Sequence, residues 1–242
     1  MQQRNMEFYE KYIKRFFDIV CAVLAMVVFC WLYLIIAILV KLRLGSPVIF
    51  KQPRPGMIDK KTGEEKIFYL YKFRTMTNCV GADGKLLSDK DRLGRLGGFL
   101  RSTSLDEIPE AWNILKGDMS VVGPRPQLVR DMVFMTDRQR MRHTARPGLS
   151  GLAQVNGRNA VSWEEKINWD LEYIKKITFW GDLKIIFKTV KQVFVSSHKE
   201  ENREQVDLAL DYGDVLLKEG KVSKEEYDNL QIQAENILRS MK

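Results

Sequence analysis

The strongest pattern along the chain is an unbroken run of apolar side chains near the N-terminus. Residues 19–40 read IVCAVLAMVVFCWLYLIIAILV, 22 positions without a charge. As a helix the run is about 33 Å long, close to the thickness of a bilayer core. Its length and the lack of a small-residue cleavage site disfavour a signal peptide, and a buried core helix is seldom so uniformly apolar. We therefore expect a membrane-anchoring helix within residues 1–43.

Basic residues flank this run on both sides. Lys14 and Arg15 precede it, and Lys41 and Arg43 follow it. Positive flanks favour the cytoplasmic side, and a re-entrant helix, which enters and leaves the bilayer on one side, keeps both clusters there. A sharp bend usually needs proline, but residues 29–32 in the middle contain neither proline nor glycine. The charges favour a re-entrant helix and the missing breaker favours a straight span; we expect the re-entrant form.

Aromatic and β-branched residues dominate the next two stretches. Residues 47–50 and 66–73 are typical of strands, and DKKTG at 59–63 is turn material, so a β-hairpin is expected. Helical spacing prevails after residue 88. The pattern predicts an α+β fold that is mostly helical, with the hairpin packed on helices.

Two later segments combine apolar and basic residues. In 183–195, Leu183, Phe187 and Val190 share one helical face, while lysines occupy another. Residues 130–142 mix Met and Phe with four arginines. Each segment fits either a core-facing helix or an amphipathic helix at the membrane interface.

The last part of the chain has a different character. Gly220 separates two helical patterns, 206–218 and 223–240, and Ser223 with Glu226 forms a capping box. We expect a helical hairpin used for packing or self-association.

Charge divides the chain in the same place. Residues 199–242 carry 7 basic and 11 acidic residues, whereas the first 198 carry 32 and 20, a net of +12. A basic body suits polyanions: nucleic acid, anionic lipid or phosphorylated small molecules. Cys21, Cys30 and Cys79 have no metal-binding spacing and indicate no disulfide framework.

Residues 104–126, SLDEIPEAWNILKGDMSVVGPRP, carry the candidate chemistry. Helical spacing starts near Asp106, with Pro109 in the first turn and Gly117 at the end. Taken alone, Ser104 and Glu107 fit an ordinary capping box. The alternative is a reactive site for phosphate.

Three features favour the reactive site. A helix N-terminus attracts anions and would keep Asp106 ionised. Arginines crowd the region, and GPRP holds one on a rigid backbone; they are Arg92, Arg95, Arg101 and Arg125. A carboxylate can attack phosphorus, with Mg²⁺ offsetting the repulsion between anions.

A glycine-rich stretch follows at 145–158, ARPGLSGLAQVNGR. Such a loop can bring backbone close to a ligand. Arg146 and Arg158 can reach phosphates, and Gln154 or Asn156 a base or sugar. An ordinary turn-rich connection is about as good an interpretation of this stretch alone.

Six motifs follow one another along the chain: KRxxD at 14–18, QxRxG at 52–56, YKFRTM at 71–76, DExP at 106–109, GDMSxVGPRP at 117–126, and RPG at 146–148 through GR at 157–158. In this order the motifs resemble the bacterial sugar transferase family, the monotopic phosphoglycosyl transferases, over residues 11–197. The chain is similar to the small members, which contain a membrane helix and a catalytic domain.

The resemblance implies that a sugar 1-phosphate moves from a UDP-sugar to undecaprenyl phosphate, with release of UMP. An N-acetylated amino sugar is the expected donor sugar. Asp106 would carry the covalent phosphosugar, Glu107 would assist it, and Mg²⁺ would bind at both. The remaining substrate-binding residues expected are Lys72, Arg74, Arg101, Arg125, Arg146, Gln154, Asn156, Arg158 and Asp170. The enzyme would lie at the bacterial cytoplasmic membrane, against membrane lipid, with its catalytic domain on the cytoplasmic face.

The sequence also departs from the family pattern. Cys30-Trp31 replaces a Ser-Pro pair in the membrane helix, and Pro109-Glu110-Ala111 replaces Pro-Gln-Leu, which we interpret as a packing change. We expect an anchor at 1–43, a catalytic domain at 44–198 and an unmatched tail at 199–242. The tail suggests self-association or contact with downstream glycosyltransferases.

Two other classes of protein fit parts of the sequence. The basic body suggests a membrane-tethered nucleic-acid binder, but the aromatic residues follow apolar periodicity and do not alternate with basic ones. We therefore expect no nucleic-acid partner. A non-catalytic assembly protein is the second rival, and an assay with UDP-sugar and undecaprenyl phosphate separates it from an enzyme.

Overall fold

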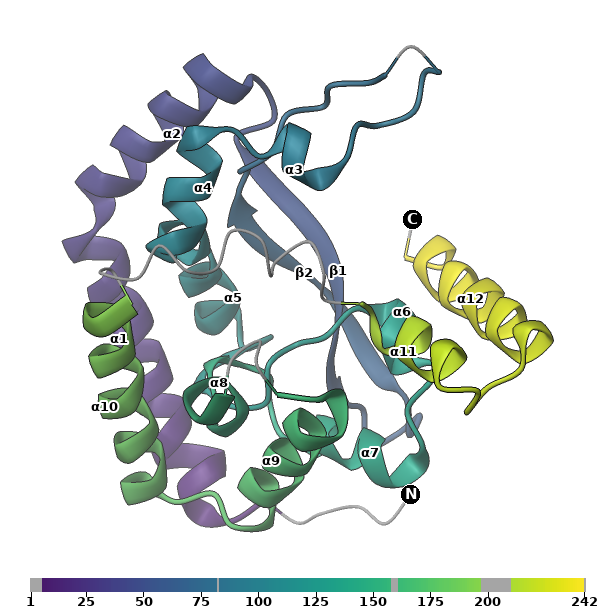
Figure 1. Cartoon of the computed structure of the whole chain (residues 1–242). Helices are drawn as coiled ribbons and strands as arrows, with labels where there is room; N and C mark the ends of the chain where they lie inside the picture. The colour runs from purple at the N-terminus through teal and green to yellow at the C-terminus, as the bar shows by residue number, and fades with distance from the viewer. Residues whose placement is uncertain (1–5, 82, 158–160, 197–209, 242) are drawn as a thin grey trace.

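The computed structural model of the chain describes residues 6–81, 83–157, 161–196 and 210–241. It is mostly helical, with two small sheets (Figure 1). The first half contains η1 (Tyr9–Ile13), α1 (Lys14–Val28), α2 (Cys30–Leu44), β1 (Ile49–Ile58), β2 (Glu65–Phe73), α3 (Asp89–Arg92), α4 (Arg95–Ser102), η2 (Leu105–Glu107) and α5 (Glu110–Lys116). The second half contains β3 (Ser120–Val122), α6 (Val129–Met132), α7 (Asp137–Arg140), η3 (Met141–Thr144), β4 (Gly148–Ser150), α8 (Leu152–Gly157), α9 (Trp163–Lys175), α10 (Phe179–Ser196), α11 (Tyr212–Lys218) and α12 (Lys224–Arg239).

The apolar N-terminal run is bent near its middle, as the expected re-entrant form requires, although no proline or glycine lies there. The segments Tyr9–Val28 and Cys30–Leu44 meet at 63°, and Phe29 between them has φ −99° and ψ 11°. Within the described residues no single helix is long and apolar enough to cross a membrane. By length and composition, the two helices of the bent pair together are long and apolar enough. The pair fits either a broken span or a re-entrant loop.

Packing explains a bend that has no proline. On α1, Ala22 is buried in one cluster with Ile114 of α5. On α2, Val40 is buried in another cluster, with Phe73 and Leu100. Because each half follows its own part of the core, tertiary contacts set the angle between them.

Buried polar contacts fix α1 to the rest of the protein. Nζ of Lys14 lies 2.7 Å from Oδ2 of Asp182 on α10, and the hydroxyls of Tyr9 and Tyr173 donate to the same carboxylate. Oδ1 of Asp18 accepts hydrogen bonds from Ser120 Oγ and Val121 N, both at 2.9 Å.

Arg15 ties the same helix to α5. It donates to the carbonyls of Ile114 and Leu115, which lie in the last turn of α5. The helix that follows Asp106 and Glu107 is therefore held directly by α1.

The expected β-hairpin is confirmed. β1 and β2 are antiparallel, with Ile49 opposite Phe73 and Arg54 opposite Phe68. β1 is longer than the expected strand at 47–50 and runs through two prolines. Proline is tolerated because β1 pairs with β2 alone, so its other edge needs no donors.

The two glycine-rich motifs meet in a parallel pair, β3 and β4, which the sequence did not predict. A Cβ on Gly123 would lie 2.2 Å from the carbonyl oxygen of Arg146, and one on Gly151 would lie 2.2 Å from that of Gly123. These glycines allow backbone to pack closely on backbone.

The two amphipathic segments differ in their outcome. Residues 183–195 belong to α10, where Ile185 is buried while Phe187 is 68% and Val190 47% exposed. α10 therefore has an apolar face toward solvent. Residues 130–142 form α6, α7 and η3, and Met132 in this segment is buried, so the core-facing alternative holds there.

The C-terminal hairpin is formed by α11 and α12. Oγ of Ser223 caps α12 by accepting the backbone N–H of Glu226, as expected. Ala234 packs with the apolar residues of α6, and Tyr212 is buried with Phe134. The helical pattern expected at 206–209 lies outside the described residues. Figure 1 shows the hairpin on the edge opposite α1, α2 and α10.

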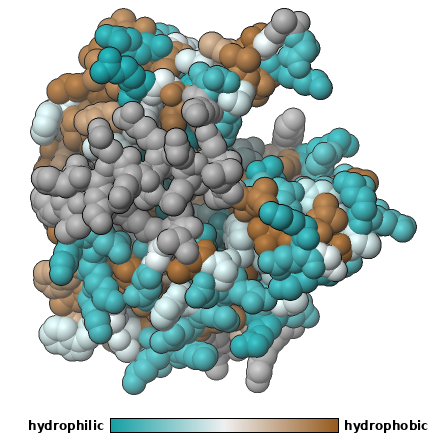
Figure 2. Space-filling view, in the orientation of Figure 1, coloured by the Kyte–Doolittle hydropathy of each residue, from teal (hydrophilic) through white to brown (hydrophobic). Residues whose placement is uncertain are grey.

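Exposed apolar side chains gather on the bent helix pair and α10. Figure 2 shows hydrophobic surface at the upper left, over α2 and α4, and a mainly hydrophilic lower rim. The largest exposed side chains of this face are Phe16, Val27, Trp31, Leu34, Leu42, Phe99, Trp180 and Phe187. An apolar face of this extent is typical of a membrane or protein contact.

We predict that Lys14→Met lowers the free energy of unfolding by about 3–5 kcal/mol, because it leaves Asp182 buried without its cation. Chemical denaturation in detergent micelles measures the change. The control is Lys224→Met, whose partner Asp228 is exposed and whose ion pair contributes about 0.5 kcal/mol or less. Equal effects of the two variants would contradict a structural role for the buried pair.

Candidate active site

The acidic dyad lies in a short turn before α5. Leu105–Glu107 form one turn of 3₁₀ helix, and α5 begins at Glu110 with Pro109 as its N-cap residue. The capping box, which was the alternative to a reactive site, is absent, because Ser104 is left-handed, with φ 56°, and its side chain makes no capping hydrogen bond. The α-helix therefore starts four residues later than Asp106, and Glu107 is free to face other partners.

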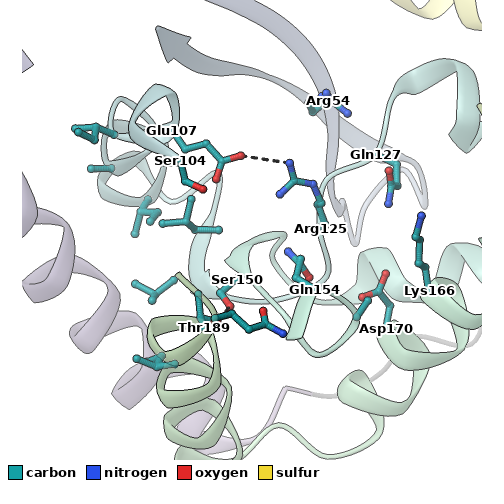
Figure 3. Close-up of a pocket in the computed structure, with 18 of the residues that line it drawn as sticks. Arg54, Ser104, Glu107, Arg125, Gln127, Ser150, Gln154, Lys166, Asp170 and Thr189 are labelled. Carbon is teal, nitrogen blue, oxygen red and sulfur yellow. Dashed lines mark hydrogen bonds and ion pairs between the residues drawn. The ribbon is translucent and has the colours of Figure 1, made fainter. Parts of the chain in front are cut away.

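Glu107 faces a basic cluster. Nζ of Lys72 lies 2.6 Å from Oε1 of Glu107 and 3.2 Å from Oε1 of Glu110. Nη2 of Arg125 lies 3.3 Å from the same oxygen of Glu107, and Figure 3 shows this contact. Lys72 of β2 therefore forms ion pairs with the carboxylates of both Glu107 and Glu110.

The carboxyl groups in this cluster have different acidities. Burial raises the pKa of Asp106 to about 6, more than Lys72 and Arg101 lower it. Asp106 is nevertheless mainly ionised at pH 7. Burial also raises the pKa of Glu107, but Arg125 and Lys72 outweigh it and hold that pKa well below its usual range.

Glu110 belongs to the charged cluster, which the sequence did not reveal. Burial and the charge of Glu107 raise its pKa to about 7. We had interpreted the Glu110 substitution as a packing change, but the carboxyl group is 3.2 Å from the lysine that also binds Glu107. The signal was present as an unexpected acid one helical turn after the dyad.

Two cavities meet at the dyad. Their volumes are about 790 and 530 Å³. Residues that line both include Arg54, Arg101, Glu107 and Arg125. The junction therefore has three guanidinium groups around one carboxylate.

The larger cavity has two unlike ends. One end is apolar and lies against α1 and α10, where its lining includes Cys21, Ala25, Phe29, Ile186 and Val190. The other end is polar, with Gln127, Gln154, Lys166 and Asp170 (Figure 3). Such a shape can accept an amphipathic molecule or two different substrates.

The smaller cavity contains Asp106 and is strongly basic. Its other charged lining residues include Lys72, Arg74, Arg92 and Arg101. Guanidinium groups and a lysine around one aspartate are suited to phosphate oxygens.

Arg54 is a site residue that we did not select from the sequence, although its QxRxG motif was recognised. It lines both cavities and donates to Gln52 Oε1 and the carbonyl of Pro126. Burial lowers its pKa to about 10, and within the described residues it forms no ion pair with a carboxylate. A buried arginine without an acidic partner favours an anionic ligand.

The structure brings together some of the expected residues. Lys72, Arg101 and Arg125 surround the dyad, and Gln154 and Asp170 line the polar end of the larger cavity. Arg74 lines the smaller cavity, but its guanidinium donates to the carbonyls of Met76 and Ser46.

Three other expected residues are not part of this cluster. Nε of Arg146 donates to the carbonyl of Gly117, at the opposite end of α5. Asn156 accepts a hydrogen bond from Lys188 Nζ at 3.3 Å. Arg158 lies outside the described residues. Sequence order placed Arg146 near the phosphate site, but the β3–β4 pairing turns it toward the far end of α5.

A metal bound at this site would need donor atoms from a substrate or water in addition to the protein carboxylates. Within the part of the chain that the structure describes, no three His, Cys, Asp or Glu side chains form a metal-binding group. Mg²⁺ is commonly held by one or two carboxylates together with substrate phosphates and water. Asp106 and Glu107 fit that smaller donor set, since both cations of Glu107 contact the same oxygen, Oε1.

Comparison with known proteins gives a consistent family. The family model described as bacterial sugar transferase matches residues 9–196. The uncharacterized sugar transferase EpsL of Bacillus subtilis is 45% identical over 184 residues, covering 76% of this chain and 88% of EpsL.

Longer relatives are also similar. The UDP-glucose:undecaprenyl-phosphate glucose-1-phosphate transferase of Klebsiella pneumoniae is 39% identical over 193 residues, covering 76% of this chain but 40% of the relative. The UDP-N-acetylgalactosamine-undecaprenyl-phosphate N-acetylgalactosaminephosphotransferase of Aeromonas hydrophila is 39% identical over 191 residues, covering 75% and 44%. The chain therefore spans less than half the length of these two proteins.

We predict that Asp106→Asn stabilises the protein at high pH. The pKa of Asp106 is higher in the folded than in the unfolded protein, so the ionised group penalises folding from about pH 4 upward, and the penalty is complete above about pH 6. A pKa raised from 3.8 to about 6 corresponds to about 3 kcal/mol, the upper limit of the expected gain at pH 8.

Thermal unfolding at pH 4 and pH 8 measures this gain, which should shrink as the pH falls. Asp228→Asn is the control, because Asp228 is exposed and lies on α12 of the C-terminal hairpin. A destabilised Asp106→Asn protein at pH 8 would contradict a buried, unfavourable charge.

Proposed function

The chain belongs to the bacterial sugar transferase family, and we propose that it transfers a sugar 1-phosphate from a UDP-sugar to undecaprenyl phosphate and releases UMP. The observation that supports this most strongly is the meeting of two unlike cavities at the Asp106–Glu107 dyad. The apolar end beside α1 and α10 suits a polyprenyl chain, and the basic cavity suits the phosphates of a nucleotide donor. The activity is that of a phosphoglycosyl transferase.

The names of the relatives support the substrate classes. Two of them specify undecaprenyl phosphate, one with glucose and the other with N-acetylgalactosamine. Since these sugars differ, family likeness does not select one. An N-acetylated amino sugar is the donor that we propose to test first.

In the proposed first step, a carboxylate oxygen of Asp106 attacks the β-phosphorus of the UDP-sugar. The bond from this phosphorus to the oxygen that bridges to the α-phosphate breaks, and UMP leaves with the electron pair. The sugar phosphate is then an acyl-phosphate on Asp106. Arg54, Arg101 and Arg125 at the junction offset the charge of the phosphoryl oxygens.

In the second step, a phosphate oxygen of undecaprenyl phosphate attacks the same phosphorus. The Asp106–phosphorus bond breaks, and Asp106 recovers its carboxylate. Glu107 holds Lys72 and Arg125 beside the reacting phosphate throughout. Mg²⁺ bound by Asp106 and Glu107 would supply further charge neutralisation.

The exposed apolar face supports a membrane location. It covers α1, α2 and α10, and the apolar end of the larger cavity lies against α1 and α10. We propose that the bent pair is re-entrant and that the catalytic domain lies on the cytoplasmic face of the bacterial membrane. Both basic flanks of the pair would then remain on the cytoplasmic side.

We predict that Asp106→Asn reduces UMP release by at least about 10³-fold, because an amide is a poor nucleophile toward phosphorus. Purified protein in detergent, undecaprenyl phosphate and a panel of UDP-sugars provide the assay. Asp228→Asn should retain wild-type activity. Full activity of Asp106→Asn would exclude this side chain as the nucleophile.

We also predict that both ends of the bent pair label from the cytoplasmic side. Single cysteines replace Glu7 and Lys51, which are exposed and flank the pair, in a chain where Cys21, Cys30 and Cys79 are changed to Ala. A membrane-impermeant maleimide should modify both in inside-out vesicles and neither in right-side-out vesicles. Opposite labelling of the two positions would indicate a span.

A further inference from the structure

The polar end of the larger cavity contains buried polar atoms that lack partners. Asp170 is 1% exposed, and its Oδ2 accepts a hydrogen bond from Arg142 Nε at 3.0 Å, but its Oδ1 has no hydrogen-bond partner within the described residues. Both Oε1 and Nε2 of Gln154 are likewise buried and unpaired. Figure 3 shows Asp170 and Gln154 at the same end of the cavity, near Lys166.

These unpaired atoms favour a neutral ligand that is rich in hydroxyl groups. Buried polar groups without partners are unfavourable, so a ligand that satisfies them gains affinity. A hydroxyl both donates and accepts, and can therefore pair with a carboxylate oxygen and with both amide atoms. A phosphate would be repelled by the Asp170 carboxylate, whereas the smaller, basic cavity accepts phosphates.

The C-terminal hairpin forms part of the wall at this end. Leu210 and Asp211 line the cavity together with Trp163 of α9. Nε1 of Trp163 donates to the carbonyl of Leu210 at 3.0 Å, and Asp211 forms an ion pair with Arg130.

The base of the hairpin is fixed to the body just after this point. The backbone N–H of Tyr212 donates to Oδ1 of Asp131 at 3.0 Å. The ring of Tyr212 packs at a tilt against that of Trp163, with the ring centroids 5.3 Å apart. The family match ends at residue 196. One wall of this pocket is therefore built by residues outside the matched segment.

We propose that the polar end of the larger cavity binds the sugar of the donor, and that Asp211 of the C-terminal hairpin helps to select it. This inference rests on the proposed function. Gln154 and Asp170 contact sugar hydroxyls from the body of the protein. Asp211 faces the sugar from the hairpin, so proteins that lack this hairpin would select donors differently.

Gln154→Leu tests the pocket with little risk to the fold. Replacing an unpaired buried amide by an apolar group of similar size should leave the melting temperature unchanged or higher. We expect kcat/KM for the preferred UDP-sugar to fall at least about tenfold, the value of one good hydrogen bond, while inhibition by UMP is unchanged. Unchanged kcat/KM, or an equal loss of UMP inhibition, would overturn the sugar assignment.

Asp211→Asn tests the role of the hairpin, with Asp228→Asn on α12 as the matched control. We expect the ratio of kcat/KM between UDP-glucose and UDP-N-acetylgalactosamine to change at least about fivefold in the first variant and to stay constant in the second. Melting temperatures of both proteins check the docking of the hairpin. If Asp211→Asn keeps wild-type activity and the ratio is unchanged, the role proposed for the hairpin is overturned, but the proposed function is not. If the wild-type protein releases no UMP from any UDP-sugar, the proposed function is overturned as well.

Discussion

The structure depends on polar groups buried between α1 and the body of the protein. Lys14 pairs with Asp182, Asp18 accepts from β3, and Arg15 caps the last turn of α5. Each contact would be costly to break, because an isolated buried charge is strongly unfavourable. α5 begins shortly after the dyad, so the same contacts that hold α1 also set the position of Asp106. A fixed position suits the proposed reaction, in which a water-soluble donor and a lipid acceptor meet at one carboxylate.

Electrostatics then gives the neighbouring acids different roles. Asp106 is buried enough for its pKa to rise, whereas Glu107 takes the two nearest cations and stays ionised. Glu110 shares Lys72 with Glu107 and has a raised pKa. Acids whose environments drive their pKa values apart are a recurrent feature of active sites. The unfavourable buried charge of Asp106 is the cost expected of the reactive group that we propose.

The sequence predicted features that depend on local pattern. The β-hairpin followed from aromatic and β-branched strands around DKKTG, and α12 from the cap at Ser223. The charges favoured a bent, re-entrant run, but no residue at 29–32 marked the bend, which arises from the packing of two helix halves on separate clusters. The capping box that Ser104 and Glu107 allow does not form, and Glu107 contacts Lys72 and Arg125, which are distant in sequence. Arg146 was misplaced because only the β3–β4 pairing fixes its direction. The resemblance identified the family and led us to select the dyad, while Arg54 and Glu110 emerged as parts of the cluster only in three dimensions.

The central claim is that Asp106 carries the sugar phosphate between the two substrates. The most direct measurement incubates the protein with a labelled UDP-sugar in the absence of lipid acceptor, quenches in acid and maps the modified peptide by mass spectrometry. The account predicts one hexose- or aminosugar-phosphate adduct on the peptide containing Asp106, which disappears when undecaprenyl phosphate is added. Turnover to lipid product with no adduct at any time, or an adduct on another residue, would contradict it.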